Sequence, residues 1–317
     1  MPTSNPKEFR ILSLSGGGYL GLYTAVVLAD LEKQAGEPLG RRFDLIAGTS
    51  VGGLLAMALA FEVPMAHIVQ LFMERGEEVF SSRRLPGGAV TRLLDMTRSV
   101  LGPKYTGEAL RRELTRHFGE RTMGDALHAV VVPAVDVTRS ATKIFKTPHT
   151  QGSLGDEGLP AVDVTLATCA APAYFPCVKV GDRIYADGGL FAVAPDQVAL
   201  HEADHFMGAK QARTRMLSVG TATMGYQPAD AVDADAGAVG WLTDGRLILT
   251  MISVQQQHVK AVMEDRLEDR YMRLDAHWPV QAGLGIDVAT PEATKTLIGL
   301  GEKTLAELDR TRLAAFL

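Results

Sequence analysis

The sequence predicts a three-layer α/β/α fold with a mostly parallel central sheet and a helical lid region. Two observations lead to this prediction. Apolar, strand-like runs at residues 9–14 and 43–47 each pass through a glycine-containing turn into a helix-like run, which is the order of a βαβ unit. Strand-like and helix-like runs then alternate along the rest of the chain, which is typical of a parallel sheet with helices on both faces.

The expected elements follow from their residue patterns. The runs F-R-I-L-S-L at residues 9–14 and F-D-L-I-A at residues 43–47 read as buried strands. Similar apolar runs predict further strands at residues 129–136, 183–186, 216–221 and 270–274. Apolar positions that recur on one helix face predict helices at residues 22–34, 54–59, 241–271 and 291–316.

Composition favours one domain over residues 1–317. A chain of 317 residues with 46% hydrophobic content can bury a large core, and it has no internal repeat and no long Pro-, Ser- or Gly-rich linker. The net charge of −5 argues against binding to a nucleic-acid polymer. The first ten residues lack the apolar core of a secretory signal, and Cys169 and Cys177 are too few for a disulfide framework. We therefore expect a cytoplasmic protein.

Ser50 is the candidate nucleophile. It stands at the centre of G-T-S-V-G, residues 48–52, a G-x-S-x-G pattern located where a strand-like run meets a helix-like run. A strand that turns directly into a helix at a serine strains the backbone, and the flanking glycines let neighbouring segments approach closely. The hydroxyl is then exposed at a helix N-terminus, where the amides and the helix dipole favour an alkoxide or an oxyanion.

Gly16, Gly17 and Gly18 are the candidate oxyanion donors. Three successive glycines before a helix offer backbone N–H groups that can converge on an anion. The stretch also fits the dinucleotide-binding pattern G-x-G-x-x-G through Gly16, Gly18 and Gly21. That alternative expects an acidic residue at the end of the next strand, where this chain has the turn at 48–52. A tight turn without a ligand is the other alternative.

The base is the less obvious part of the site. In α/β-hydrolases a histidine follows the serine, but no neighbourhood singles out one of the downstream histidines, His201, His205, His258 and His277. Asp187 ends a strand-like run and precedes two glycines. In a dry site its carboxylate can take the serine proton directly, because desolvation raises its basicity. An Asp-Gly pair is also a common surface turn, and this alternative stays open.

A metal site is a further alternative at residues 201–205. His201, Glu202 and His205 fit H-E-x-x-H, in which two histidines on one helix face hold zinc. The third ligand is missing, because position 211 is Gln and no glutamate lies between His205 and Glu264. We therefore expect a solvent-facing helix here, with no metal and no cofactor.

Three of these segments together resemble patatin-like phospholipases. Residues 15–21, 48–53 and 187–189 match the glycine-rich oxyanion loop, the nucleophile elbow and the D-G-G motif of that family in order and spacing. The resemblance covers about residues 9–225 and continues at residues 104–105, 109–114, 123–127, 129–136 and 170–176. It implies a patatin-like fold and a Ser50/Asp187 dyad without histidine, with the amides around Gly16 to Gly18 as oxyanion donors. It further implies hydrolysis of glycerophospholipid acyl esters through an acyl-serine intermediate.

Two positions depart from the family pattern. Leu20 stands where the family usually carries Arg or Lys, and Ala194-Pro195 stands where many members have Asn-Pro. Neither position touches the proposed dyad. Leu20 removes a positive charge from the oxyanion loop, so we expect an effect on head-group preference or on loop geometry.

Within the family, residues 12–19 and 43–50 are most similar to the phospholipase effectors of bacterial CBASS antiphage defence. This resemblance implies a membrane phospholipid substrate, action at the inner face of the membrane and activation by a cyclic dinucleotide, and no nucleotide-binding residue can be matched. A different class remains as the alternative, a nucleotide-sensing or protein-interaction module with this fold and little hydrolysis. The charged stretch at residues 264–270 suits solvent or a subunit contact, which leaves a homo-oligomer open.

A basic and apolar segment at residues 72–98 is the candidate membrane surface. It carries Arg83, Arg84, Arg92 and Arg98 together with apolar residues. Basic side chains among exposed apolar ones suit docking on an anionic bilayer. An ordinary amphipathic helical cap over the sheet is the alternative, and a lid above an active site would combine both.

Overall fold

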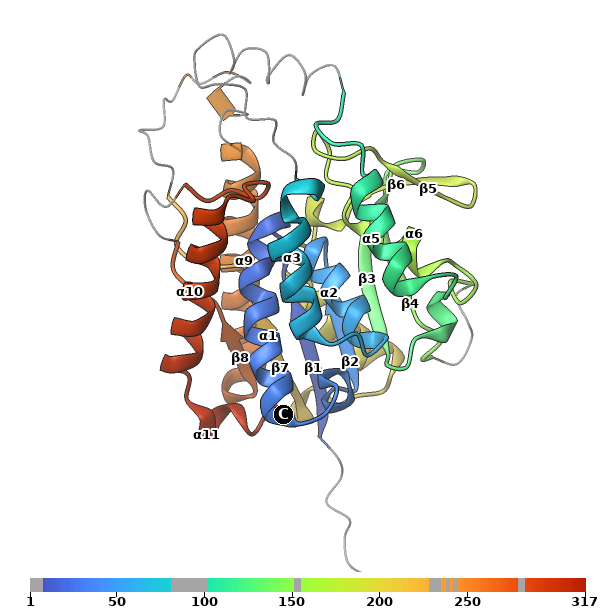
Figure 1. The fold of residues 1–317 in the computed structure, drawn as a ribbon. Helices are drawn as coiled ribbons and strands as arrows, with labels where there is room; N and C mark the ends of the chain where they lie inside the picture. Colours follow the sequence, from blue (N-terminus) through green and yellow to red (C-terminus); the bar gives the residue numbers. More distant parts are fainter. Residues whose placement is uncertain are drawn as a thin grey trace, which may run out of the picture.

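The computed structural model describes residues 8–80, 102–150, 155–227, 235, 237, 240–241, 245–278 and 283–317. Over these residues the chain forms a central sheet with a layer of helices on each face (Figure 1). Of the candidate membrane surface at residues 72–98, only residues 72–80 are described. Its arginines Arg83, Arg84, Arg92 and Arg98 lie outside the described residues, and so does most of the expected lid region.

The sheet of the described chain has eight strands. They are β1 (Phe9–Leu14), β2 (Leu45–Gly48), β3 (Val130–Asp136), β4 (Ala141–Lys146), β5 (Val178–Val180), β6 (Arg183–Asp187), β7 (Thr214–Val219) and β8 (Tyr271–Leu274). The order across the sheet is β5-β6-β3-β2-β1-β7-β8, and β4 also pairs with β3. Pairing is parallel from β8 through β7, β1 and β2 to β3, and antiparallel where β4 and β6 join β3 and where β5 joins β6. The predicted mostly parallel sheet is confirmed.

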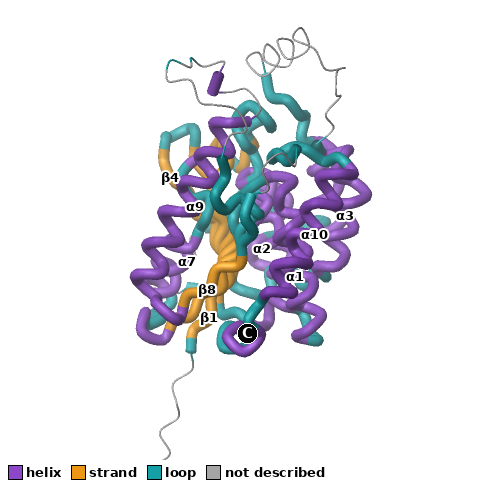
Figure 2. Tube along the Cα trace, turned by 90° about the vertical axis from the view of Figure 1, so that its left-hand side faces the viewer, coloured by secondary structure: helices purple, strands orange, loops and turns teal. Residues whose placement is uncertain are grey.

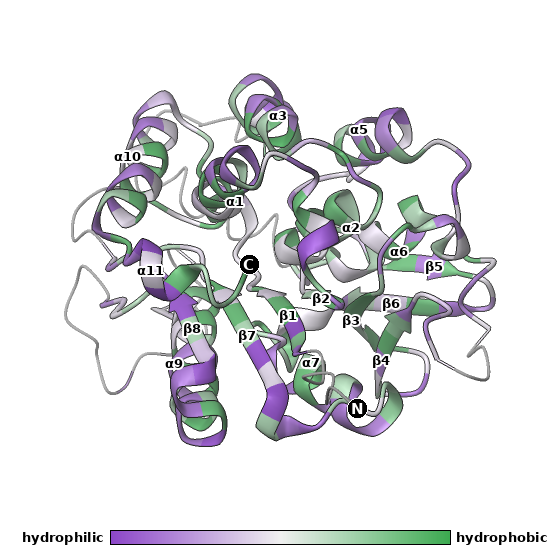
Figure 3. Cartoon of the chain, turned by 90° about the horizontal axis from the view of Figure 1, so that it is seen from below, coloured by the Kyte–Doolittle hydropathy of each residue, from purple (hydrophilic) through white to green (hydrophobic). Residues whose placement is uncertain are grey.

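Helices cover both faces of this sheet. The helices are α1 (Gly21–Ala35), α2 (Val51–Ala60), α3 (Met65–Val79), α5 (Glu108–Phe118), α6 (Ala161–Thr168), α7 (Asp196–His201), α9 (Arg246–Leu267), α10 (Pro291–Glu307) and α11 (Arg310–Leu313). Figure 2 shows α7 and α9 on one side of the strands and α1, α2, α3 and α10 on the other side. The view along the strands in Figure 3 adds α5 and α6 to the second group. The predicted three-layer α/β/α arrangement is therefore confirmed.

The parallel strands read as apolar runs because both of their faces are covered. Ile11 and Leu12 are neighbours in β1, so their side chains point to opposite faces, and neither side chain has exposed surface. Leu12 packs in the larger core with side chains of α1 and α2, whereas Ile11 packs in a second core with side chains of α7 and α9. The sheet thus separates two cores.

The two C-terminal helices are shorter than predicted. The helix expected to reach residue 271 ends with α9 at Leu267, and the chain enters β8 at Tyr271. The helix expected at 291–316 ends with α10, because Leu308 is extended and Asp309 begins a new helix, α11, by accepting the backbone N–H groups of Thr311 and Arg312. No helix of the described chain combines the length and the apolar character that crossing a bilayer requires.

Candidate active site

Ser50 sits on a sharp turn between β2 and α2. Its backbone has φ 56° and ψ −128°, a left-handed conformation that is strained for a residue with a Cβ, and α2 begins at the next residue. The turn closes only around glycines. A Cβ on Gly48 would lie 2.1 Å from the carbonyl oxygen of Gly52, and one on Gly52 would lie 2.2 Å from that of Leu14. The structure therefore contains the strand-turn-helix elbow that the G-x-S-x-G pattern predicts.

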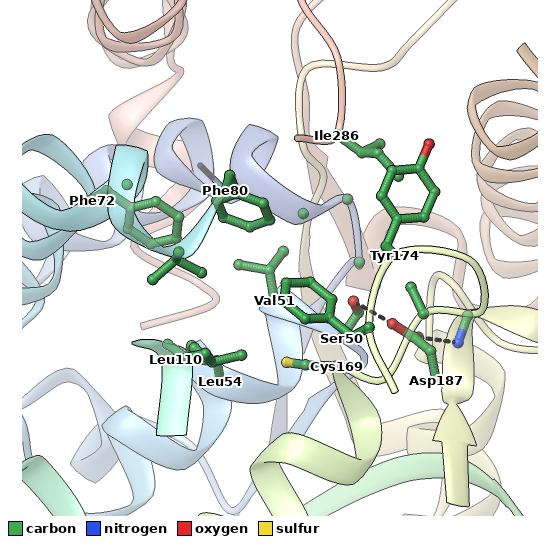
Figure 4. A pocket seen from close by; sticks show the side chains of 18 of the residues that line it. Ser50, Val51, Leu54, Phe72, Phe80, Leu110, Cys169, Tyr174, Asp187 and Ile286 are labelled. Carbon is green, nitrogen blue, oxygen red and sulfur yellow. Dashed lines mark hydrogen bonds between the residues drawn. The ribbon is translucent and has the colours of Figure 1, made fainter. Parts of the chain in front are cut away.

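The side chains of Ser50 and Asp187 point toward one another (Figure 4). The hydroxyl of Ser50 donates a hydrogen bond to Oδ2 of Asp187 at 2.7 Å. The sheet topology produces this contact. Strand β6 runs antiparallel to β3 and places Asp187 opposite Ala134, beyond the level at which β2 turns into the elbow. Gly188 permits the close approach, since a Cβ there would lie 2.3 Å from the carbonyl oxygen of Pro133.

Burial makes the Asp187 carboxylate an effective base. Its side chain is only 5% exposed. Desolvation raises the pKa of Asp187 from its ordinary value to about 6, and hydrogen bonds from the Gly189 N–H, at 2.7 Å, and from Ser50 oppose that rise. Near neutral pH the carboxylate is still mostly ionised, and it is more basic than an exposed aspartate. It can accept the proton of Ser50 without an imidazole.

The glycine loop lies directly against Ser50, the candidate nucleophile. A Cβ on Gly16 would be 3.1 Å from Cβ of Ser50, and Gly18, with φ +58°, would place a Cβ 2.0 Å from the carbonyl oxygen of Ile286. The Gly16 N–H is already donated to the carbonyl of Val193 at 2.8 Å. Among the described residues, the N–H groups of Gly17 and Gly18 have no acceptor. Of the three predicted oxyanion donors, these two have N–H groups available for a ligand.

The third glycine of the dinucleotide-like pattern has a packing role. A Cβ on Gly21 would lie 2.5 Å from Cγ2 of Val51, so this glycine lets the start of α1 rest on the elbow. Leu20, which replaces the usual basic residue, has no exposed surface and packs in the larger core. The loop therefore faces Ser50, and the nucleotide alternative loses support because β2 ends in the elbow where the ribose acid would stand.

Thr168 is a functional candidate that the sequence did not reveal. The Ser50 N–H donates to Oγ1 of Thr168 at 2.9 Å, and the Thr168 hydroxyl donates to the carbonyl of Pro133 in β3 at 2.6 Å. Thr168 thus ties the elbow to the strand that also positions Asp187. No local pattern marks it, because it ends an apolar helical run like any other buried threonine.

An apolar pocket opens at Ser50. Figure 4 shows Leu54, Phe72, Phe80 and Leu110 on one side of Ser50, with Cys169 beside it. The pocket continues between α2, α3 and α5, where it is lined by Ala58, Val63, Ile68, Leu71, Leu114 and Phe118. Its walls suit a hydrocarbon chain rather than a polar ligand. Burial raises the pKa of the Cys169 thiol well above its ordinary range, so this thiol stays neutral beside the dyad.

None of the eight histidines, all of which lie in the described residues, is hydrogen-bonded to Ser50 or Asp187. The H-E-x-x-H segment differs in part from the expected solvent-facing helix. His201 and His205 are exposed and their rings stack at 5.3 Å, but Glu202 is buried and pairs with Lys146 at 2.6 Å and His149 at 3.2 Å. Glu202 therefore belongs to an ion-pair cluster, and the described chain holds no group of three or more metal-ligating side chains.

The sequence is similar to those of known proteins over most of its length. The family model described as patatin-like phospholipase matches residues 12–200. A cGAMP-activated phospholipase from Pseudomonas aeruginosa is 40% identical over 293 residues, which is 92% of this chain and 82% of that protein. Proteins of the same name from Vibrio cholerae and Escherichia coli are 32% and 29% identical, over 96% and 93% of this chain and 94% and 88% of their own lengths.

Proposed function

This chain belongs to the patatin-like phospholipase family and is a lipid acyl hydrolase, and on that premise we propose that Ser50 and Asp187 form its catalytic dyad, cleaving acyl esters of membrane glycerophospholipids. The observation that carries the proposal is the 2.7 Å hydrogen bond from the Ser50 hydroxyl to a buried carboxylate whose pKa is raised to about 6. Two glycine N–H groups without acceptors among the described residues, those of Gly17 and Gly18, lie in the loop against Ser50 and support the same assignment.

The first half of the reaction forms an acyl-enzyme. Oγ of Ser50 attacks the ester carbonyl carbon while Oδ2 of Asp187 takes the hydroxyl proton. The carbonyl oxygen becomes an oxyanion and accepts hydrogen bonds from Gly17 and Gly18; each such donor is worth about 10²- to 10³-fold in rate. The intermediate then collapses, the bond to the lysophospholipid oxygen breaks, and that oxygen receives the proton held by Asp187.

The second half releases the fatty acid. Asp187, ionised again, takes a proton from a water molecule, whose oxygen attacks the acyl carbon bound to Ser50. The bond to Oγ breaks, and Ser50 regains its proton from Asp187. The apolar pocket that opens at Ser50 holds the hydrocarbon chain through both steps, which orients the ester over the dyad.

The names of the relatives suggest how the enzyme is controlled. Three of them are cGAMP-activated phospholipases, aligned over more than nine tenths of this chain. We propose that this chain is likewise activated by a cyclic dinucleotide and degrades phospholipid from the cytoplasmic side of the membrane as an antiphage effector. No nucleotide-binding residue is assigned.

Fatty-acid release from vesicles of phosphatidylethanolamine and phosphatidylglycerol tests both proposals. The purified full chain is assayed alone and with 3′,3′-cGAMP, cyclic di-GMP or cyclic di-AMP. We expect release that depends on one of these nucleotides and is lost in Ser50→Ala. Labelling by a fluorophosphonate probe, with and without nucleotide, separates an inactive resting enzyme from the alternative of a binding module. A serine that no nucleotide makes reactive would contradict hydrolysis.

A further inference from the structure

Resting on the dyad proposed above, we propose that Gln255 of α9 is a positioning residue that fixes the separation of nucleophile and base. Its side chain makes two hydrogen bonds to the segment that follows Asp187. Oε1 accepts the N–H of Val193 at 3.1 Å, and Nε2 donates to the carbonyl of Gly189 at 3.1 Å. One amide group therefore holds both ends of the turn at residues 189–193.

Each end of this turn leads to one half of the dyad. At the first end, the Gly189 N–H donates to Oδ1 of Asp187 at 2.7 Å. At the second end, the Val193 carbonyl accepts the N–H of Gly16, the glycine that lies against Cβ of Ser50. A displacement of Gln255 would thus reach the base through Gly189 and the oxyanion loop through Val193.

The middle of the turn has little packing of its own. Leu190 is 42% exposed and Phe191 is 37% exposed, so burial does not fix their positions. Backbone hydrogen bonds from the N–H groups of Phe191 and Ala192 to the carbonyl of Gly188 shape the turn itself, and the hydrogen bonds from Gln255 attach it to α9. A glutamine is suited to the task because its amide can donate to a carbonyl and accept from an N–H at the same time. Neither a carboxylate nor an ammonium group can do both near neutral pH.

Helix α9 is itself anchored to the sheet by the next residue. Oε1 of Gln256 accepts hydrogen bonds from Nη2 of Arg273 at 2.7 Å and from the Thr223 hydroxyl at 2.9 Å. Arg273 lies in β8 and is paired with Asp275 at 2.8 Å, with both side chains only 4% exposed. The adjacent glutamines therefore connect the core of the sheet, through α9, to the turn at residues 189–193, which contacts Asp187 and the glycine loop.

The test uses three variants of the full chain, activated as the wild type requires. Gln255→Leu removes both hydrogen bonds, and Gln255→Glu keeps an acceptor for Val193 but loses the donor to Gly189. Gln257→Leu is the matched control, because Gln257 is exposed on the same helix and bonds only to Ser253 among the described residues. We measure kcat, KM and the pH dependence of kcat/KM, together with the thermal unfolding of each variant.

We expect both Gln255 variants to lower kcat by about 10²-fold with little change in KM, because misplacing reacting groups by about 1 Å costs that much. The acid limb of the pH profile should also move to higher pH. The Gly189 N–H lowers the pKa of Asp187, so loosening that bond raises it, and the carboxylate introduced in Gln255→Glu raises it further. A purely structural defect would lower kcat/KM by the same factor at every pH and would not move the acid limb of the profile.

The outcomes separate this inference from the proposed function. Wild-type kcat in Gln255→Leu, an equal loss in Gln257→Leu, or a fall in rate with an unmoved acid limb would each overturn the positioning role alone. If Gln255→Leu does not fold, Gln255→Glu decides by the same criteria. A wild-type enzyme without Ser50-dependent hydrolysis would overturn the dyad and, with it, the role assigned to Gln255.

Discussion

The hydroxyl of Ser50 lies 2.7 Å from a carboxylate oxygen of Asp187, although 137 positions separate the two residues in the chain. Because the carboxylate contacts the hydroxyl directly, the proposed dyad requires no intervening histidine. Ser50 lies on the elbow between β2 and α2 and Asp187 ends β6, so secondary-structure elements bring the two groups together.

Ser50→Ala should abolish lipid hydrolysis. The variant loses the atom that forms the acyl-enzyme, so we expect fatty-acid release to fall by roughly four orders of magnitude or more. Thermal unfolding should show a folded protein. Replacing His201, His205, His258 or His277 serves as the comparison and should cost little. Substantial activity in the alanine variant would show that another residue is the nucleophile.

The pH profile of kcat/KM should have an acid limb near pH 6. Asp187 must be ionised to accept the proton of Ser50, and its pKa is raised to about 6 by burial, so the rate should fall about tenfold for each pH unit below that value. His117 lines the pocket, and burial lowers the pKa of its imidazole, so a titration of this histidine would also produce an acid limb. His117→Gln is therefore the control, and disappearance of the limb in that variant would assign it to the histidine.

Asp187→Asn should lower the activity and raise the free energy of unfolding. The folded-state pKa of Asp187 lies above its unfolded value, so its contribution to stability is present below about pH 4 and is lost as pH rises through about 6. Asparagine carries no charge to bury, and its carbonyl can still accept the Gly189 N–H. At pH 7 we expect a gain on the order of 3 kcal/mol in the free energy of unfolding, at about 1.4 kcal/mol for each pKa unit.

Urea unfolding of the wild type and the variant at pH 7 and pH 4 measures this effect. The difference between the two proteins should shrink strongly at the lower pH, because Asp187 is then protonated in the folded state and about half protonated in the unfolded state. An asparagine variant that is less stable at pH 7 would mean that the carboxylate gains more from its hydrogen bonds than it loses by burial.

Ala58→Phe should shorten the acyl chains that the enzyme accepts. Ala58 is buried on α2 and lines the pocket two helical turns beyond Ser50, so a phenyl ring there would block the path of a long chain. We expect p-nitrophenyl butyrate hydrolysis to persist and p-nitrophenyl palmitate hydrolysis to fall at least tenfold. Met73→Phe, at an exposed position of α3 outside this pocket, is the control. Equal losses on both esters would point to a damaged fold instead.

Much of the sheet could be predicted because its parallel strands are buried on both faces. Strands β1, β2, β3, β7 and β8 fall within about two residues of the expected positions. Strands β4 and β5 were not predicted, since only Phe145 and Lys146 of the six residues of β4 are buried and β5 has only three residues. The residue pattern of α5 also did not predict a helix, because only Leu114 and Phe118 of its eleven residues are buried.

The residues of the candidate site also differ in how far the sequence could predict them. Ser50 stands in a local pattern that a strand-turn-helix requires, whereas Asp187 could equally have been a surface turn, and only the family resemblance paired the two. Thr168 and Gln255 left no signal in the sequence. Thr168 is hydrogen-bonded to Ser50, 118 positions away, and Gln255 is hydrogen-bonded to Val193, 62 positions away. Such contacts depend on the assembled fold.

Thr168→Val should separate the support of the elbow from its chemistry. Valine matches threonine in shape but leaves the Ser50 N–H and the Pro133 carbonyl without their partner, which costs about 1–3 kcal/mol for a buried group. Because that N–H bond helps to hold Ser50 at φ 56°, we also expect kcat to fall at least tenfold. Thr168→Ser keeps the hydroxyl and should retain most of the activity, with only a packing loss from the missing methyl group. The measurements are kcat and the free energy of unfolding of the two variants. A fully active valine variant would show that the elbow holds its strained conformation without this bond.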